Sequence, residues 1–165
     1  MTATTASPAE EWVEIYNPCA SAVDVTGWTL VYRGANVTGA TDSTLLTSLT
    51  GLMAPGEFRL YAGIDYLGTN DGKWMETVPN ANGLIGKTAG AVGLRAGAKD
   101  TGDLQDSIAY GAATPGHPFI EKQPTPAMDS DKSASRLPLD GNDRNDNSVD
   151  FQIIAVGTPR ASNGL

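Results

Sequence analysis

The residues best suited to chemistry gather in one tract near the end of the chain. Seven of the eleven positions from residue 140 to residue 150 are Asp or Asn, whose side-chain oxygens are typical ligands of Ca²⁺. Asp143, Asn145 and Asn147 stand at alternate positions, the spacing with which a calcium-binding loop wraps its cation. A calcium site in this tract would take its ligands from Asp140, Asp143, Asn145, Asn147 and Asp150.

The same tract also fits a turn that is ordered without any metal. Ser148 stands where a standard EF-hand loop has glycine, and Ile154 stands where that loop has glutamate. Asp and Asn side chains accept hydrogen bonds from nearby backbone N–H groups, and such bonds order a tight turn before a strand. We favour this structural interpretation and keep calcium binding as the alternative.

Catalytic chemistry finds less support in the sequence. His117 is the single histidine, so a Ser-His-Asp or Cys-His site would have to use it, and no G-x-S-x-G elbow is present. Residues 81–88 (ANGLIGKT) approach a phosphate-binding loop, but the sequence after them is too rich in glycine for the helix that such a loop needs. We predict a protein that is not an enzyme and requires no cofactor. A hydrolase that uses His117 is the least favoured alternative.

Aromatic rings offer one further binding chemistry, because flat rings stack on the faces of sugars. The candidates for such a platform are Trp12, Tyr61, Tyr66 and Trp74. Combined with the calcium tract, they would make a calcium-dependent module that binds surface glycans. Packing in the core is the commoner role of aromatic residues.

Composition and charge limit the class of protein. The 165 residues include 19 Gly and 10 Pro, which interrupt helices, and the acidic residues are mostly Asp, which favours turns. Eleven basic residues against 19 acidic ones give a net charge of −8, which repels nucleic acid and anionic membranes. The single Cys allows no internal disulfide. The chain shows neither an apolar run of membrane-spanning length nor a signal peptide.

Short alternating segments between turn signals predict the positions of strands. Val13 and Ile15 share one face of a strand over residues 12–16, and Trp28, Leu30 and Tyr32 share one face of another. Further strands are predicted at residues 23–25, 58–62, 91–95, 105–110, 133–137 and 149–154.

The remaining segments are predicted to connect these strands. We expect residues 34–51 to form a long loop whose leucines pack as a lid, and residues 63–90 to form a decorated hairpin or an insertion. The pattern as a whole predicts an all-β fold, an antiparallel β-sandwich of about eight or nine short strands. We expect one domain over residues 1–165.

A series of fragments follows one order along almost the whole chain. They are residues 11–18 (EWVEIYNP), 23–30 (VDVTGWTL), 53–58 (MAPGEF), 106–110 (DSIAY), 135–138 (SRLP), 143–151 (DRNDNSVDF) and 157–163 (GTPRASN). Together they resemble the lamin tail domain, in particular its bacterial branch. The resemblance implies an immunoglobulin-like β-sandwich, in agreement with the predicted strands.

The resemblance also implies a role without catalysis. Bacterial relatives are accessory modules of exported or surface proteins, so it implies protein binding or spacing in a larger secreted or cell-surface protein. Family members usually open with an additional apolar strand, whereas residues 2–10 hold almost nothing apolar. We therefore expect the chain to be part of a longer protein. We also expect the missing strand to leave an open sheet edge that favours a dimer.

Overall fold

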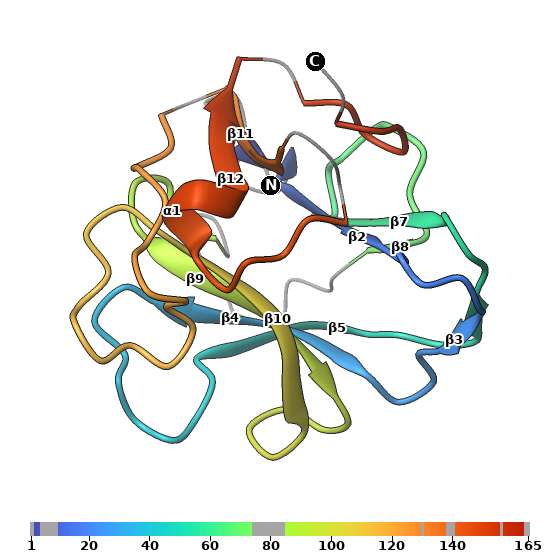
Figure 1. The fold of residues 1–165 in the computed structure, drawn as a ribbon, viewed down its shortest axis with the longest axis horizontal. Helices are drawn as coiled ribbons and strands as arrows, with labels where there is room; N and C mark the ends of the chain where they lie inside the picture. The colour runs from blue at the N-terminus through green and yellow to red at the C-terminus, as the bar shows by residue number, and fades with distance from the viewer. Residues whose placement is uncertain are drawn as a thin grey trace.

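The chain folds into layers of β-strands, and its two largest sheets lie face to face (Figure 1). The computed structural model describes residues 2–3, 10–73, 85–129, 131–137, 141–155 and 157–163. Over these residues the regular structure is almost entirely strand, with a single helix, α1 (Asn147–Asp150), which confirms the predicted all-β class. No helix in the described part of the chain is long and apolar enough to span a bilayer.

Six strands form the sheet in the upper half of Figure 1. In spatial order they are β12 (Phe151–Ile154), β11 (Lys132–Arg136), β1 (Thr2–Ala3), β2 (Trp12–Tyr16), β7 (Phe58–Ala62) and β8 (Gly72–Lys73). Neighbours pair antiparallel except β7 and β8, which are parallel. Strand β8 lies in the segment predicted as a decorated hairpin or an insertion (residues 63–90), of which residues 74–84 lie outside the described part.

Four strands form the second large sheet, in the lower half of the figure. In spatial order they are β10 (Asp103–Tyr110), β9 (Gly90–Ala96), β4 (Thr29–Gly34) and β5 (Thr44–Ser48), all antiparallel. Strands β3 (Val23–Asp24) and β6 (Leu52–Met53) pair in a small ribbon at one end.

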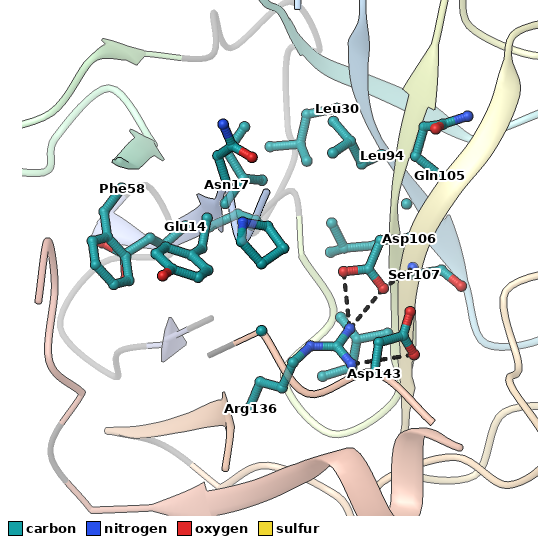
Figure 2. A pocket seen from close by; sticks show the side chains of 18 of the residues that line it. Glu14, Asn17, Leu30, Phe58, Leu94, Gln105, Asp106, Ser107, Arg136 and Asp143 are labelled. Atoms are coloured by element: carbon teal, nitrogen blue, oxygen red, sulfur yellow. Dashed lines mark hydrogen bonds and ion pairs between the residues drawn. The ribbon is translucent and has the colours of Figure 1, made fainter. Parts of the chain in front are cut away.

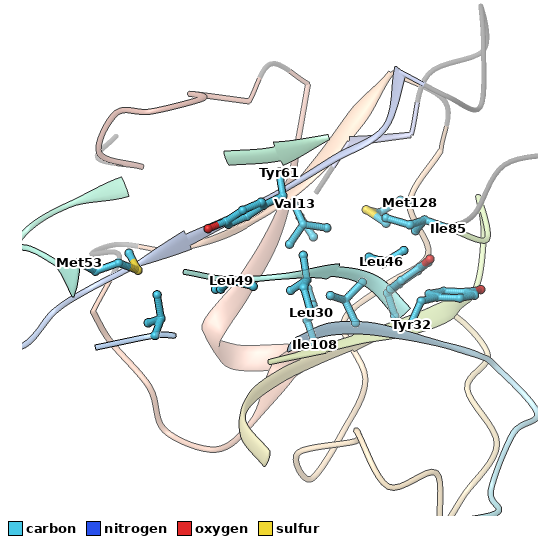
Figure 3. Close-up of a cluster of buried hydrophobic side chains, with 14 residues drawn as sticks. Val13, Leu30, Tyr32, Leu46, Leu49, Met53, Tyr61, Ile85, Ile108 and Met128 are labelled. Atoms are coloured by element: carbon cyan, nitrogen blue, oxygen red, sulfur yellow. The ribbon is translucent and has the colours of Figure 1, made fainter. Parts of the chain in front are cut away.

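The main core fills the space between the two large sheets (Figure 3). Val13 from β2 and Tyr61 from β7 meet Leu30 from β4 and Ile108 from β10 there. Ile15 packs against the same cluster, which confirms the predicted inner face of β2. Alternation sends the other side chains of β2 to the outer face of the upper sheet.

Two elements differ from the sequence prediction. Residues 34–51 contain strand β5, which pairs with β4, so the prediction of one long loop is wrong. Leu46 and Leu49 are buried in the main core, and β-branched threonines beside them suit a half-buried strand. The strand predicted at residues 149–154 begins later, at Phe151, because α1 occupies the preceding turn.

A buried ion cluster lies on the outer face of the β4–β9 sheet. Asp42 accepts hydrogen bonds from Nε of Arg33 and from Nε of Arg95, both at 2.7 Å, and its carboxylate is fully buried. The Phe119 ring lies against both guanidinium groups, at 5.0 and 5.4 Å. Gly93 leaves room for this ring, because a Cβ there would lie 2.8 Å from it. Burial alone would raise the pKa of Asp42, but the arginine hydrogen bonds outweigh burial and lower it.

A buried carboxyl group, Glu11, lies just before β2. Its Oε2 accepts a hydrogen bond from the Ile85 N–H at 2.9 Å. The next residue, Gly86, donates its N–H to the Tyr32 hydroxyl at 3.0 Å, and its carbonyl accepts a bond from the Tyr110 hydroxyl. Burial raises the pKa of Glu11 to about 7, although the bond from Ile85 opposes this shift.

Candidate functional site

A pocket of about 360 Å³ opens between the two sheets (Figure 2). Its volume is within the range of natural ligand pockets. Strands β2 and β11 form its sides, and strands β4, β9 and β10 form its floor. Most of the lining is apolar and includes Val13, Ile15, Trp28, Leu30, Leu94, Ile108 and Phe151.

The pocket has a polar end at Arg136 (Figure 2). Nη2 of Arg136 donates to both carboxylate oxygens of Asp106, at 2.7 and 2.9 Å, and Nη1 lies 3.5 Å from Oδ1 of Asp143. The guanidinium also lies over the ring of Phe151, 4.4 Å from its centroid, in cation–π geometry. A ligand in this pocket would meet apolar walls and, at one end, an arginine whose charge is already paired.

Three carboxylates converge near this polar end. One oxygen from each of Glu121, Asp143 and Asp150 lies within 4.8 Å of the other two. Asp150 is fully buried, and its Oδ1 has no hydrogen-bond partner among the described residues, although it lies 3.5 Å from Nε of Arg144. Burial, aided by nearby negative charge, raises the pKa of Glu121 to about 7. Three such oxygens in one place suit a hard cation such as Ca²⁺.

The structure brings together two of the five predicted calcium ligands, Asp143 and Asp150. Asn145 is exposed, and its backbone N–H donates to Oδ1 of Asp143 at 2.9 Å. Oδ2 of Asp150 accepts the N–H groups of Arg144 and Asp146 at 2.8 and 3.2 Å. These are bonds of the kind that the turn interpretation expects. Asp140 lies outside the described residues.

The side-chain oxygen of Asn147 bonds to backbone N–H groups and does not join the three converging carboxylate oxygens. Its Oδ1 accepts the N–H groups of Ala109 and Glu121 at 3.0 and 3.2 Å. Its Nδ2 donates to the carbonyl of Ser107 and to Oε2 of Glu121, both at 2.9 Å. Both lone pairs of the amide oxygen are therefore engaged, and the side chain ties α1 to β10 and to the connection between β10 and β11 that contains Glu121.

Glu121 is a member of the carboxylate cluster that sequence reasoning missed. It lies far from the Asp- and Asn-rich tract, and no spacing links the two segments. The one signal is that Glu121 is the sole acidic residue between residues 111 and 128. A lone acid in a segment rich in proline is too common to identify a ligand.

The other candidate residues lie away from the pocket or are covered. His117 is 2% exposed, and its Nδ1 accepts the Phe119 N–H at 3.1 Å. Burial, with the nearby positive charge of Arg33, lowers the pKa of His117, so its imidazole is neutral at pH 7. The residues that follow Gly86 lead into strand β9, so the segment that approaches a phosphate-binding loop lacks the helix that such a loop needs.

The aromatic candidates do not share one exposed face. Trp12 and Tyr61 are buried, at 8% and 4% exposure, and so offer little ring surface for stacking on a sugar. Tyr66 is partly exposed and packs beside Trp12 and Leu60. Trp74 lies outside the described residues.

Comparisons with known proteins identify no relative of this chain. No protein-family model matches the chain, and neither the curated proteins nor the solved structures contain a match to it. Function must therefore be inferred from the pocket and from the polar groups at its end.

Proposed function

We propose that this chain is a non-catalytic binding module that holds an apolar segment of a partner polypeptide in the pocket between its sheets. The pocket is the observation that carries the proposal. Its volume of about 360 Å³ is within the range of natural ligand pockets. Its apolar lining, with a few polar groups at one end, is typical of a pocket that binds a ligand.

The wider setting of the module follows from its resemblance to the lamin tail domain. Segments that carry the resemblance coincide with strands β2, β3 and β10 and with the start of β7. The two facing sheets support an immunoglobulin-like sandwich as the finer fold. We propose a domain of the bacterial lamin tail type that serves as an accessory part of a larger exported or surface protein.

The environment of His117 supports a role without catalysis. A general base must reach its substrate, whereas His117 is buried beside Phe119 and is not among the residues that line the pocket. Arg136, the most prominent charged group of the pocket, is paired with Asp106, which suits orientation of a ligand better than chemistry on it.

Selection from a displayed library of random peptides tests the proposal. We expect enrichment of peptides rich in apolar residues, and at least about tenfold weaker binding of these peptides to a Leu94→Lys variant, because the new charge lies on the pocket floor. Leu67→Lys is the matched control, since Leu67 is 95% exposed and lies outside the pocket lining. Thermal melts establish that both variants fold. Failure to enrich any peptide, or equal binding by both variants, would contradict the proposal.

The cluster of Glu121, Asp143 and Asp150 supports a second candidate function, calcium binding. The observation in its favour is the buried Oδ1 of Asp150, which lacks a hydrogen bond and belongs to the group of converging oxygens. Arg136 competes with a cation there, because its Nη1 lies 3.5 Å from Asp143 and 3.6 Å from Asp150.

Thermal melts with calcium and with a chelator test this second candidate. If the cluster binds calcium, a concentration of 100 times the dissociation constant stabilises the fold by about 2.7 kcal/mol. We expect the shift to disappear in an Asp143→Ala variant and to persist in Asp103→Ala, which removes an exposed acid elsewhere. An unchanged melting temperature in millimolar calcium would rule the site out.

A further inference from the structure

Two charged side chains lie on the inner faces of the sheets, which are otherwise mostly apolar. Asp106 of β10 pairs with Leu94 of β9 and stands two residues before the core residue Ile108, so its side chain is on the inner face of the lower sheet. Arg136 stands two residues after the core residue Ala134 on β11, so its side chain points inward from the upper sheet. The two side chains meet at the polar end of the pocket (Figure 2).

A β-bulge at Gln105 gives Asp106 its inward position. Leu104 pairs with Arg95, which belongs to the ion cluster on the outer face, and Gln105 is the extra residue of the bulge. The next residue, Asp106, pairs with Leu94 on the inner face. Regular alternation would place Leu104 and Asp106 on one face, so the bulge turns the leucine outward and the carboxylate inward. Bulges often re-aim a side chain in this way beside a functional site.

Negative charge exceeds positive charge at this end of the pocket. Among the described residues that line the pocket, Arg136 is the one basic side chain. Its guanidinium nitrogens lie 2.7 Å from Asp106, 3.5 Å from Asp143 and 3.6 Å from Asp150. Arg144, 3.5 Å from Asp150, offsets the last of these carboxylates. Asp106 and Asp143 are therefore left to share the single charge of Arg136.

These two carboxylates are more accessible than the guanidinium between them. The side chains of Asp106 and Asp143 are 45% and 43% exposed, whereas that of Arg136 is 8% exposed and packs against Phe151. An anionic group of a ligand would meet the carboxylates and be repelled. A cationic group would meet two half-exposed acceptors whose one shared partner is buried, so the charge of this end suits a cation.

We propose that the partner segment carries a lysine or arginine beside its apolar residues, and that Asp106 and Asp143 bind this basic side chain while the apolar residues fill the rest of the pocket. This inference rests on the proposed function and names the chemical class of the partner. Opposite charges beside an apolar contact fix its register and exclude partners of the wrong charge. The net charge of −8 attracts basic polypeptides and disfavours a second copy of this chain as the occupant.

Three displayed peptide libraries test the inference. Their central position is lysine in the first library, leucine in the second and glutamate in the third, and all other positions are drawn from uncharged residues. The selections contain a chelator, because a calcium ion at Asp143 would repel a basic side chain. We expect the lysine library to enrich at least about tenfold more strongly than the leucine library, and the glutamate library to enrich least. This comparison needs no variant of the protein.

Substitution on both sides of the contact then locates the basic side chain. Titration compares the best lysine peptide with its norleucine analogue, on the unmodified chain and on Asp143→Asn, whose amide oxygen can still accept the Asn145 N–H. We expect the variant to bind the lysine peptide about fivefold more weakly and the analogue equally well. Asp103→Asn is the matched control, since it removes an exposed carboxylate of β10 outside the pocket lining and should change neither affinity. Thermal melts establish that both variants fold.

The other outcomes are distinct. Equal enrichment of the lysine and leucine libraries would overturn this inference while leaving the apolar pocket as a binding site. Enrichment of the glutamate library alone would identify Arg136 as the recognition group and overturn it as well. Equal weakening by Asp143→Asn and Asp103→Asn would assign the preference to the net charge of the chain and overturn the role of this end. Failure of all three libraries, together with the random library, would overturn both this inference and the proposed function.

Discussion

Replacing Asp42 with alanine is expected to lower the free energy of unfolding by about 3–5 kcal/mol. The substitution leaves two guanidinium groups without their shared partner, and both side chains are at least nine-tenths buried. Removing one member of a buried ion cluster is far more costly than removing an exposed pair, because the remaining charges stay out of water. Urea denaturation of the variant and of the unmodified chain measures the difference.

Two further substitutions show whether the loss comes from charge. Asp42→Asn keeps the shape of the side chain but removes its negative charge, so most of the destabilisation should remain. Asp129→Ala removes an exposed acid and should change the stability by no more than about 0.5 kcal/mol. If Asp42→Asn were as stable as the unmodified chain, the charge of Asp42 would not be what holds the two arginines.

A second large effect concerns pH. The pKa of Glu11 is about 7 in the folded state and 4.5 in the unfolded state, so the folded state binds this proton more tightly. The stabilisation is complete below pH 4.5 and is lost as the pH rises through 7. The shift corresponds to about 3 kcal/mol. We expect the free energy of unfolding, measured in urea, to fall by this order between about pH 5 and about pH 8.

The variant Glu11→Gln isolates this contribution, because the amide oxygen can still accept the Ile85 N–H but the group no longer titrates. The fall in the free energy of unfolding should shrink by about 3 kcal/mol. The contribution of Glu121, whose pKa is also raised, should remain. An identical profile for Glu11→Gln would mean that Glu11 is ionised in the fold at pH 5.

The strands that the sequence predicts best are those with strict alternation and clear punctuation. Strands β2 and β7 have the predicted bounds, since alternate apolar side chains mark the first and the turn before Phe58 marks the second. Gly56, at a φ of 73°, supplies the left-handed conformation that this turn requires. Strand β5 lacks such alternation, because two leucines stand side by side in it. Helix α1 is too short to show a helical period.

The site residues, like the strands, are predictable from the sequence only where the signal is local. Asp143 and Asp150 are predictable because one short tract contains both, and the turn that holds them is local. Glu121 joins them only through the fold, since Asn147 binds its backbone and its side chain. The pocket has no local signature at all. It depends on β2 and β11. These strands are far apart in the sequence, but they lie on either side of β1 in the sheet.

The strand order of the two sheets also has a consequence for synthesis on the ribosome. All four strands of the lower sheet come from residues 29–110, so that sheet can assemble as soon as this stretch has emerged. The upper sheet is completed later, because β11 and β12 come from residues 132–154, whereas its β2, β7 and β8 come from residues 12–73. Contacts between distant segments form slowly, and the apolar inner face of the lower sheet is only partly covered until β11 and β12 arrive. During this period the nascent chain exposes apolar surface that can aggregate, so a chaperone would have its largest effect then.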